Sequence, residues 1–218
     1  MKLAAIFHTT AVTIAPLQAL AKEIMPKAEI INLAEDGMIR DVIRHGGPTA
    51  AISARVANYM LCAEKAGCEV FMTACSSIGE VVENCQMLTS MKVTRIDLAM
   101  AERAVEMGGK IAILATAATT MKPTSNLIAR KAGEARKQVE IKPYLMPEAY
   151  AALMAGDAAT HDQMVKSALS AAAADNQVIV LAQASMARVL SGMDSLAVPV
   201  LTSPELGMRH LRQLIEEN

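Results

Sequence analysis

Short apolar runs recur along the chain, and longer stretches with apolar residues at helical spacing separate them. Short β-branched or apolar runs are typical of buried strands, whereas apolar residues three or four positions apart indicate helices. We therefore predict strands at 3–7, 29–33, 70–73, 93–96, 111–115, 140–144, 178–182 and 198–201. We predict helices at 49–66, 98–107, 120–135, 147–155, 161–174 and 204–217. Strands that alternate with helices indicate an α/β fold with parallel sheets, covered on both faces.

The pattern repeats at an offset of 108 residues, the distance from Lys2 to Lys110. Residues 2–10 match residues 110–118, and residues 69–77 match residues 177–185. An internal repeat of this kind indicates two similar α/β lobes. Residues 198–217 also match 93–107 at a slightly smaller offset, so we expect the last helix to pack on the first lobe. The predicted lobes are residues 1–96 with 203–218, and residues 97–202.

Four loops are predicted at the carboxyl ends of strands, where open α/β sheets bind ligands. They form two pairs of repeat equivalents, 8–10 with 116–120 and 75–77 with 183–185. If a pseudo-two-fold axis relates the lobes, we expect all four loops to line an active site in the cleft between them. In this register Cys75 corresponds to Gln183, so a thiol in one lobe matches an amide in the other.

Cys75 is the first candidate for catalysis, because it lies between a predicted strand and a helix predicted to start near Ser77. The sequence Ser77-Ile-Gly-Glu80 has the form of a capping box. Free N–H groups and the positive end of a helix dipole favour a thiolate, which predicts a lowered pKa for the Cys75 thiol. Such a thiol can take up or return a proton. The alternative interpretation is a small buried apolar side chain, which we adopt for Cys62, Cys68 and Cys85.

His8 ends the first predicted strand and is the second catalytic candidate, either sharing protons with Cys75 or orienting it; the alternative is a structural histidine. Hydroxyl and amide side chains follow the same strand ends and, with backbone N–H groups, suit a carboxylate. The predicted substrate-binding residues are Thr9, Thr10, Ser76, Ser77, Thr116, Thr119, Thr120, Gln183, Ala184 and Ser185. Helix capping is the alternative role for the serines and threonines. Gln183 is neutral near pH 7 and cannot serve as a general base.

Composition and charge exclude several other classes of protein. The net charge is −1 and aromatic residues make up 2%, so neither a basic surface nor a stacking platform for nucleic acid is expected. No apolar run reaches the roughly 18 residues of a membrane span. The four cysteines form no CxxC pair and have no zinc-site spacing with histidine, and neither a dinucleotide fingerprint nor a P-loop is present. We therefore expect a cytoplasmic protein without metal; a homodimer or larger homo-oligomer is compatible with the sequence.

Together these residues resemble the aspartate/glutamate/hydantoin racemase superfamily over nearly the whole chain. Cys75-Ser-Ser77 resembles its first cysteine motif, and residues 181–187 resemble the second, with Gln183 at the cysteine position. Residues 116–120 resemble its threonine-rich, carboxylate-binding turn, and His8-Thr9 lies where glutamate racemases have an acidic residue and a serine. The resemblance implies two flavodoxin-like lobes and no metal or organic cofactor. Racemases of this superfamily use one cysteine from each lobe, on opposite sides of the substrate α-carbon.

The resemblance implies an isomerase, a racemase or epimerase of a small carboxylate, with Cys75 acting on one face. A substitute such as His8, bound water or a substrate group would have to act on the other face. The departure at Gln183 leaves two alternatives open. A decarboxylase or other lyase needs to deliver only one proton, which suits a single cysteine, although the arylmalonate decarboxylases of the superfamily keep theirs in the second motif. A carboxylate-binding protein without activity is the other alternative, since a fold does not fix function. The low aromatic content favours small aliphatic or hydroxy acids as substrates.

Overall fold

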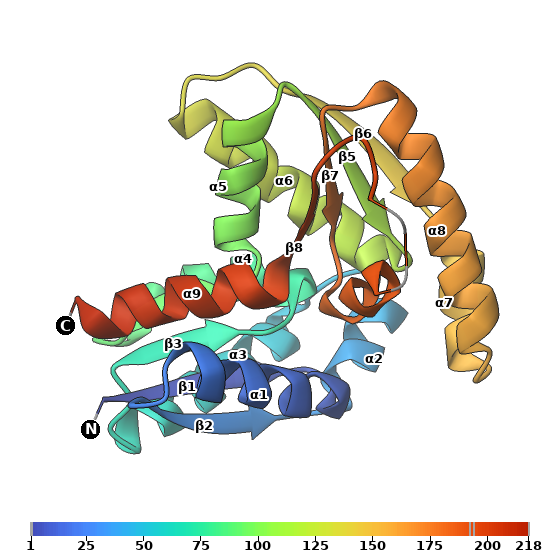
Figure 1. Cartoon of the computed structure of the whole chain (residues 1–218). Helices are drawn as coiled ribbons and strands as arrows, with labels where there is room; N and C mark the ends of the chain where they lie inside the picture. Colours follow the sequence, from blue (N-terminus) through green and yellow to red (C-terminus); the bar gives the residue numbers. More distant parts are fainter. Residues whose placement is uncertain (1, 192, 194, 218) are drawn as a thin grey trace. The chain divides into compact units, whose positions relative to one another are not determined.

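The computed structural model describes residues 2–191, 193 and 195–217, and strands alternate with helices along most of the chain (Figure 1). The chain forms two compact units. Unit 1 comprises Met1–Ile96 and Pro204–Asn218, and unit 2 comprises Asp97–Ser203. Each unit contains a four-stranded parallel sheet, in the orders β2-β1-β3-β4 and β6-β5-β7-β8. The predicted α/β fold with two similar lobes is therefore confirmed.

The sheet of unit 1 is buried at its centre and covered on both faces. Its strands are β1 (Leu3–His8), β2 (Glu29–Ala34), β3 (Val70–Thr73) and β4 (Lys92–Arg95). On one face, α1 (Ile14–Ile24) and α9 (Ser203–Glu216) pack on alternate residues of β1 and β3. On the other face lie α2 (Met38–Arg44), α3 (Ala50–Lys65) and α4 (Gly79–Asn84). Because both faces are apolar, β1 and β3 read as continuous hydrophobic runs.

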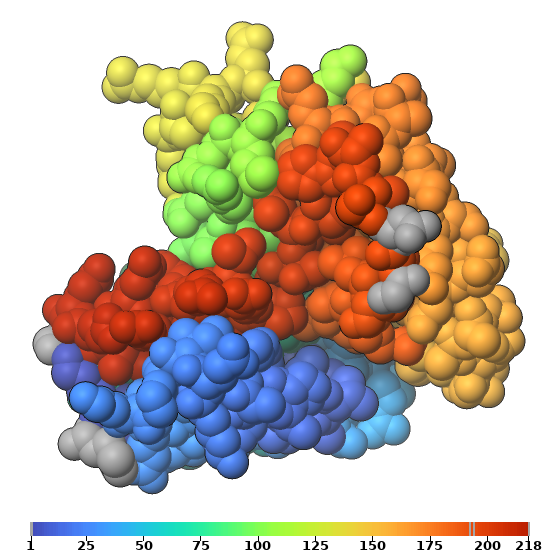
Figure 2. Space-filling model, in the orientation of Figure 1, coloured from blue at the N-terminus to red at the C-terminus, as the bar shows by residue number. Residues whose placement is uncertain are grey.

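The last helix packs beside the first residues of the chain within unit 1. Figure 2 shows α9, coloured red, lying directly against blue residues from the N-terminal part. Met208, Leu211 and Ile215 of α9 share a hydrophobic cluster with Ala4 and Ile6 of β1. A side chain at Gly207 would overlap the backbone carbonyl of Ile96, so only glycine allows this approach.

Unit 2 repeats the arrangement with its own helices. Its strands are β5 (Lys110–Ala115), β6 (Glu140–Leu145), β7 (Val178–Leu181) and β8 (Val200–Thr202). One face is covered by α8 (Ala158–Asp175) and the 3-10 helix η4 (Ala184–Leu190), with α7 (Pro147–Met154) beside α8. The helices α5 (Leu98–Met107) and α6 (Ala118–Glu134) contact each other and the central strands β7 and β5. Polar turns follow the carboxyl ends of β5 and β7, with Thr116 after β5 and Gln183 after β7.

The structure differs from the predicted elements at a few places. The prediction omitted α1 and α2; α1 carries Pro16 in its first turn, where a missing N–H costs nothing, so the proline gives no reason to exclude a helix. The helix predicted to start near Ser77 instead begins with a 3-10 turn, η2 (Ser76–Ile78), followed by α4. The last strand is β8, which starts two residues later than predicted.

Candidate active site

Two neighbouring strands of unit 1 bring the first group of predicted residues together. The strands β1 and β3 are parallel, with Phe7 opposite Thr73, so the residues after both strands leave the sheet at one edge. The Ala74 N–H donates to the Phe7 carbonyl at 2.8 Å, and the Cys75 N–H donates to the Thr73 hydroxyl at 3.2 Å. This register places Thr9 beside Cys75.

The sulfur of Cys75 is surrounded by hydrogen-bond donors. The hydroxyls of Thr9 and Ser77 and the N–H groups of Ser77 and Ile78 all bond to it. Thr9 and Ser77 are buried, whereas Cys75 itself keeps part of its surface exposed. The hydroxyls of Thr9 and Ser77 therefore act as hydrogen-bond donors to the Cys75 sulfur in this structure. Such donors are suited to stabilise a thiolate that forms when Cys75 gives up its proton.

The pKa of the Cys75 thiol was predicted to fall, and the structure overturns this prediction. Burial raises the pKa, because removing a thiolate from water costs more than the four donors return. The predicted capping box is also absent: α4 follows Ile78 without a side-chain cap, and the Ser77 hydroxyl bonds to the sulfur instead. Cys75 thus holds its proton at neutral pH.

His8 is fully buried, and both of its ring nitrogens have partners other than Cys75. Its Nδ1 lies 2.7 Å from the Thr13 hydroxyl and its Nε2 lies 3.0 Å from Oδ1 of Asn32. Asn32 in turn donates to Gln18 at 2.6 Å. Burial lowers the pKa of His8, so the ring is neutral at pH 7. These contacts fit a residue that links β1 to β2 and to the 3-10 turn before α1, Ala11–Thr13. The catalytic role predicted for His8 stays a prediction.

In unit 2, Gln183 occupies the place that Cys75 has in unit 1. Cys75 has φ −129° and ψ 113° and Gln183 has φ −122° and ψ 130°, and each immediately precedes a 3-10 helix. The side-chain oxygen of Gln183 accepts hydrogen bonds from the Thr116 N–H at 2.6 Å, the Thr116 hydroxyl at 3.0 Å and the Ala117 N–H at 3.2 Å. The donors that the resemblance assigned to a substrate carboxylate are thus bonded to the amide of the chain itself.

The remaining predicted binding residues lie on the same turns. Thr10 precedes a short 3-10 helix and its carbonyl accepts from the Thr13 hydroxyl at 3.3 Å. Ser76 and Thr120 are buried, and the buried hydroxyl of Thr119 has no hydrogen-bond partner within the described part of the chain. Ala184 and Ser185 open η4 and are partly exposed.

Sequence reasoning missed Arg95, which contacts the turn that follows Cys75. The side chain is 2% exposed, and its Nη2 donates to the Ser76 carbonyl at 3.3 Å. Its Nη1 lies 3.5 Å from Oε2 of Glu83 on α4. An arginine directly before the apolar Ile96, at the end of a predicted strand, is the sequence signal that could have drawn attention to it.

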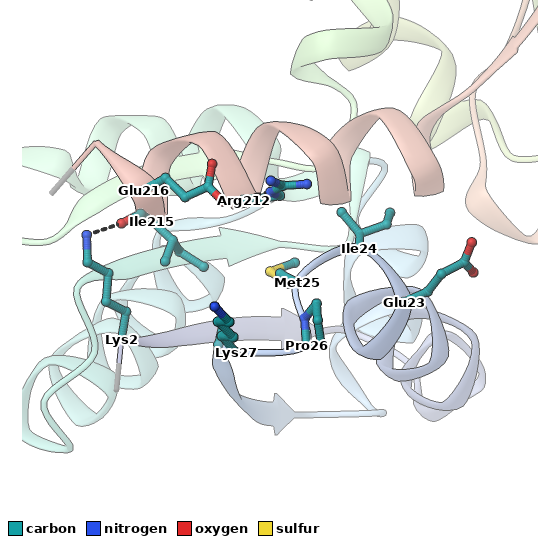
Figure 3. A pocket seen from close by; sticks show the side chains of 10 residues that line it. Lys2, Glu23, Ile24, Met25, Pro26, Lys27, Arg212, Ile215 and Glu216 are labelled. Atoms are coloured by element: carbon teal, nitrogen blue, oxygen red, sulfur yellow. Dashed lines mark hydrogen bonds and ion pairs between the residues drawn. The ribbon is translucent and has the colours of Figure 1, made fainter.

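A surface groove of about 530 Å³ lies at the opposite edge of the unit 1 sheet, where β1 and β2 begin (Figure 3). The residues that line it are Lys2, Glu23, Ile24, Met25, Pro26, Lys27, Ala28, Arg212, Ile215 and Glu216. Lys2 donates to the Ile215 carbonyl at 2.6 Å, and Arg212 bonds to Glu216 at 2.7 Å. The lysine thus sits near the last carbonyls of α9, where a cation is favourable, which indicates a structural role.

The described residues contain neither a candidate metal site nor a helix that could span a membrane. Within residues 2–191, 193 and 195–217, no cluster of three or more His, Cys, Asp or Glu side chains could hold a metal ion. No described helix combines the length and the apolar character that crossing a membrane requires.

The fold consists of two repeated parallel α/β units, each with a polar turn after its third strand. Solved structures of racemases and of a decarboxylase have the same fold. A structure of an aspartate racemase homologue from Pyrococcus horikoshii has a TM-score of 0.75 at 16% identity, covering 99% of this chain and 100% of that one. Glutamate racemase from Francisella tularensis in complex with D-glutamate has a TM-score of 0.67 at 16% identity, with 100% and 82% covered. A mutant of arylmalonate decarboxylase has a TM-score of 0.59 at 19% identity, with 98% and 93% covered.

The family assignment comes from the sequence itself. The Asp/Glu/hydantoin racemase family matches residues 8–211, which include every turn described above. The chain therefore belongs to this family, whose racemases are isomerases. No curated protein sequence matches the chain significantly.

Proposed function

We propose that the protein is an isomerase of a small carboxylate, and that Cys75 transfers the proton at the α-carbon. The observation that carries the proposal is the set of four donors around the Cys75 sulfur. A thiol that keeps its proton at rest can protonate a carbanion on one face, after a base on the opposite face has removed the α-proton, and nearby donors stabilise the thiolate that results. His8, bound water or a group of the substrate is proposed as that base, and in the reverse direction the Cys75 thiolate takes the α-proton back. Membership of a racemase family supports the same reaction type.

Hydroxyl and N–H groups at the strand ends are proposed to bind the substrate. Thr10, next to Thr9 on the β1 turn, keeps part of its surface exposed, as do Ala184 and Ser185 on the β7 turn. Donors of this kind stabilise the negative charge that develops on a carboxylate when the α-proton leaves; one donor is worth about 3–4 kcal/mol in a favourable case. The reaction proposed here needs no metal or organic cofactor. We also propose a cytoplasmic location, and a homodimer or larger assembly.

A lyase is the second candidate function, and Gln183 is the observation that favours it. Its amide has no ionisable group, and its oxygen is bonded to Thr116 and Ala117. The turn that carries the second cysteine in the resembling racemases thus supplies no proton in this chain. A reaction that removes a carboxyl group and then needs one proton suits Cys75 alone. The similarity to arylmalonate decarboxylase concerns the fold.

Proton NMR in D₂O separates the two functions. Purified protein and its Cys75→Ser variant are incubated with a panel of amino acids, hydroxy acids, hydantoins and malonates. Deuterium at the α-carbon of an intact substrate, dependent on Cys75, supports the isomerase. Loss of CO₂ with one deuterium added stereospecifically supports the lyase. Turnover that persists in the Cys75→Ser variant contradicts both mechanisms.

A Gln183→Cys variant tests whether the β7 turn lacks only its acid/base group. The substitution removes the amide that occupies the Thr116 and Ala117 donors and introduces a thiol in its place. If the proposed isomerase is correct, exchange and racemisation of a substrate found by NMR should rise. A variant that binds this substrate normally and gains no exchange would show that the turn has no acid/base role.

A further inference from the structure

A single peptide group links the buried guanidinium of Arg95 to the sulfur of Cys75. The N–H of Ser77 donates to the sulfur, and the carbonyl of Ser76 accepts from Arg95 at 3.3 Å. These two groups belong to the same peptide bond, which is trans, so they point in opposite directions. The sulfur and the guanidinium therefore bind the two ends of one dipole.

The position of Arg95 is closely defined by its neighbours. The side chain is 2% exposed at the end of β4, with Glu83 of α4 as a carboxylate partner at 3.5 Å. A Cβ atom on Gly79 would overlap the guanidinium group, so the guanidinium lies against the bare backbone at the start of α4. Glycine at position 79 leaves space for the guanidinium, and β4 fixes the backbone of Arg95. The guanidinium can therefore reach the Ser76 carbonyl without moving the turn.

Burying a guanidinium costs free energy unless its charge is paired and hydrogen-bonded. The groups that its charge affects most are therefore its hydrogen-bond partners, the Ser76 carbonyl and the Glu83 carboxylate. A cation on the carbonyl side of a peptide polarises the group and strengthens the hydrogen bond made by its N–H. The Ser77 N–H is one of the donors that stabilise a thiolate on Cys75. Hydrogen bonds from ionised donors are also stronger than neutral ones, which helps to keep the peptide in this orientation.

We propose that Arg95 is a positioning residue for Cys75, which fixes and polarises the Ser76–Ser77 peptide so that the Ser77 N–H stays directed at the sulfur. Arg95 does not touch the reacting atoms in this scheme. Its effect is on how readily Cys75 gives up and regains a proton. The inference builds on the proposed role of Cys75, but it concerns a property of the thiol that can be measured without substrate.

The test is the pH dependence of Cys75 alkylation by iodoacetamide, followed by mass spectrometry of the peptide that contains Cys75. Resolving the peptide separates Cys75 from the exposed Cys62. In Arg95→Met the pH midpoint of alkylation should move up by about 1 unit, because the thiolate loses a polarised donor. Arg95→Lys keeps the charge without the planar fork and should move it less.

Lys92→Met is the matched control, because Lys92 also lies on β4 and also donates to a backbone carbonyl, that of Leu214 at 3.2 Å. It removes the same charge from the other end of the strand, and its midpoint should equal that of the unmodified protein. A purely structural Arg95 would change the thermal midpoint of unfolding and leave the alkylation midpoint where it was.

Glu83→Gln keeps the test decisive if Arg95→Met does not fold. Removing the carboxylate leaves the guanidinium more available to the Ser76 carbonyl, so the alkylation midpoint should move in the opposite direction, downward. An unchanged or raised midpoint in a folded Glu83→Gln variant, or an unchanged midpoint in a folded Arg95→Met variant, overturns the inference. A shift as predicted in a protein without turnover on any substrate would leave the inference standing and remove the proposed function.

Discussion

The turn after β3 in unit 1 and the turn after β7 in unit 2 have nearly the same backbone, yet their side chains use it in opposite ways. At Cys75 the local donors converge on a sulfur that can exchange a proton. At Gln183 the residue supplies an acceptor of its own, and it uses the donors of Thr116 and Ala117. One difference in an internal repeat thus separates a turn with an ionisable thiol from a turn whose donors bond to an amide of the chain.

The difference shows that two turns with similar backbone angles can direct their hydrogen-bond donors to different partners. The amide oxygen of Gln183 satisfies buried N–H groups that would otherwise be costly to leave without partners. A thiol makes only weak hydrogen bonds, so the donors around Cys75 are fully used only when the sulfur is charged. The donors of the β3 turn would therefore stabilise a thiolate, whereas those of the β7 turn already bond to the Gln183 amide.

The largest effect that would break this comparison is expected from Cys75→Ser. A serine hydroxyl is a much weaker acid, so turnover should fall by a factor of about 10²–10⁴, the usual contribution of general acid–base catalysis. The rate is measured by deuterium incorporation on a substrate found by NMR. Cys62→Ser, which changes an exposed cysteine, serves as the control and should keep the full rate. Equal rates in the two variants would remove the distinction between the turns.

The second effect concerns the stability of unit 2. Gln183→Leu leaves the N–H groups of Thr116 and Ala117 without their acceptor, and both residues are largely buried. The free energy of unfolding, measured in urea, should fall by about 1–3 kcal/mol.

Gln177→Leu provides the matched control for this stability measurement. Gln177 also accepts from two backbone N–H groups, those of Gly109 and Lys110 at 2.7 and 3.0 Å, but it is exposed. Water can replace its amide, so the loss should be clearly smaller. An equal loss in both variants would mean that burial of the β7 turn contributes nothing.

A third and smaller effect is expected at Thr9. Thr9→Val removes one of the two hydroxyls that bond to the Cys75 sulfur and keeps the shape of the side chain. The pKa of Cys75 should rise further, by about 0.5–1 unit, which corresponds to the net value of one hydrogen bond. The pH dependence of alkylation measures it, and Thr89→Val, which removes a hydroxyl bonded to Glu64, is the control. A downward shift would contradict the donor role of Thr9.

The smallest effect is a pH dependence of stability from His8. Burial lowers its pKa in the folded protein, so the unfolded chain binds the proton more readily, with a usual pKa of about 6.5. The contribution of His8 to stability is therefore complete above about pH 6.5 and is lost as the pH falls through the lowered, folded-state pKa. Urea unfolding at pH 7.5 and 5 should show this loss, and His8→Gln should show less of it. A pH dependence as steep in His8→Gln would assign it to other groups.

Much of the fold could be predicted because its signals are local. Continuous apolar runs mark β1, β3, β5 and β7, and their repetition in the sequence indicated two similar lobes. The helix α1 was missed although Leu17, Ala21 and Ile24 recur at helical spacing, and α2 was missed because its seven residues are too few for a clear pattern. Of the site, the turns with Cys75 and Gln183 were located by the repeat, and their roles stay predictions.

Residues that act through distant partners could not be predicted. The pKa of Cys75 depends on burial by residues far along the chain, and its direction was predicted wrongly from the helix dipole alone. Arg95 and Gly79 are 16 residues apart in number, and only their packing shows that one makes room for the other. Likewise, the partners of His8 are Thr13, in the 3-10 turn before α1, and Asn32 of β2, and no spacing in the sequence points to either contact.

The sequence by itself determined the order of the strands, the two-fold repetition, the family and the chemical asymmetry between a thiol and an amide. These depend on residue identity and on short-range periodicity, which are read directly from the chain. Tertiary structure alone decided which donors meet the sulfur of Cys75, that burial raises its pKa, and that Arg95 lies behind its turn. Hydrogen bonding and desolvation depend on which atoms lie close together in space. In unit 1 these contacts form only when β1 and β3 pair in the sheet and bring the residues after both strands together.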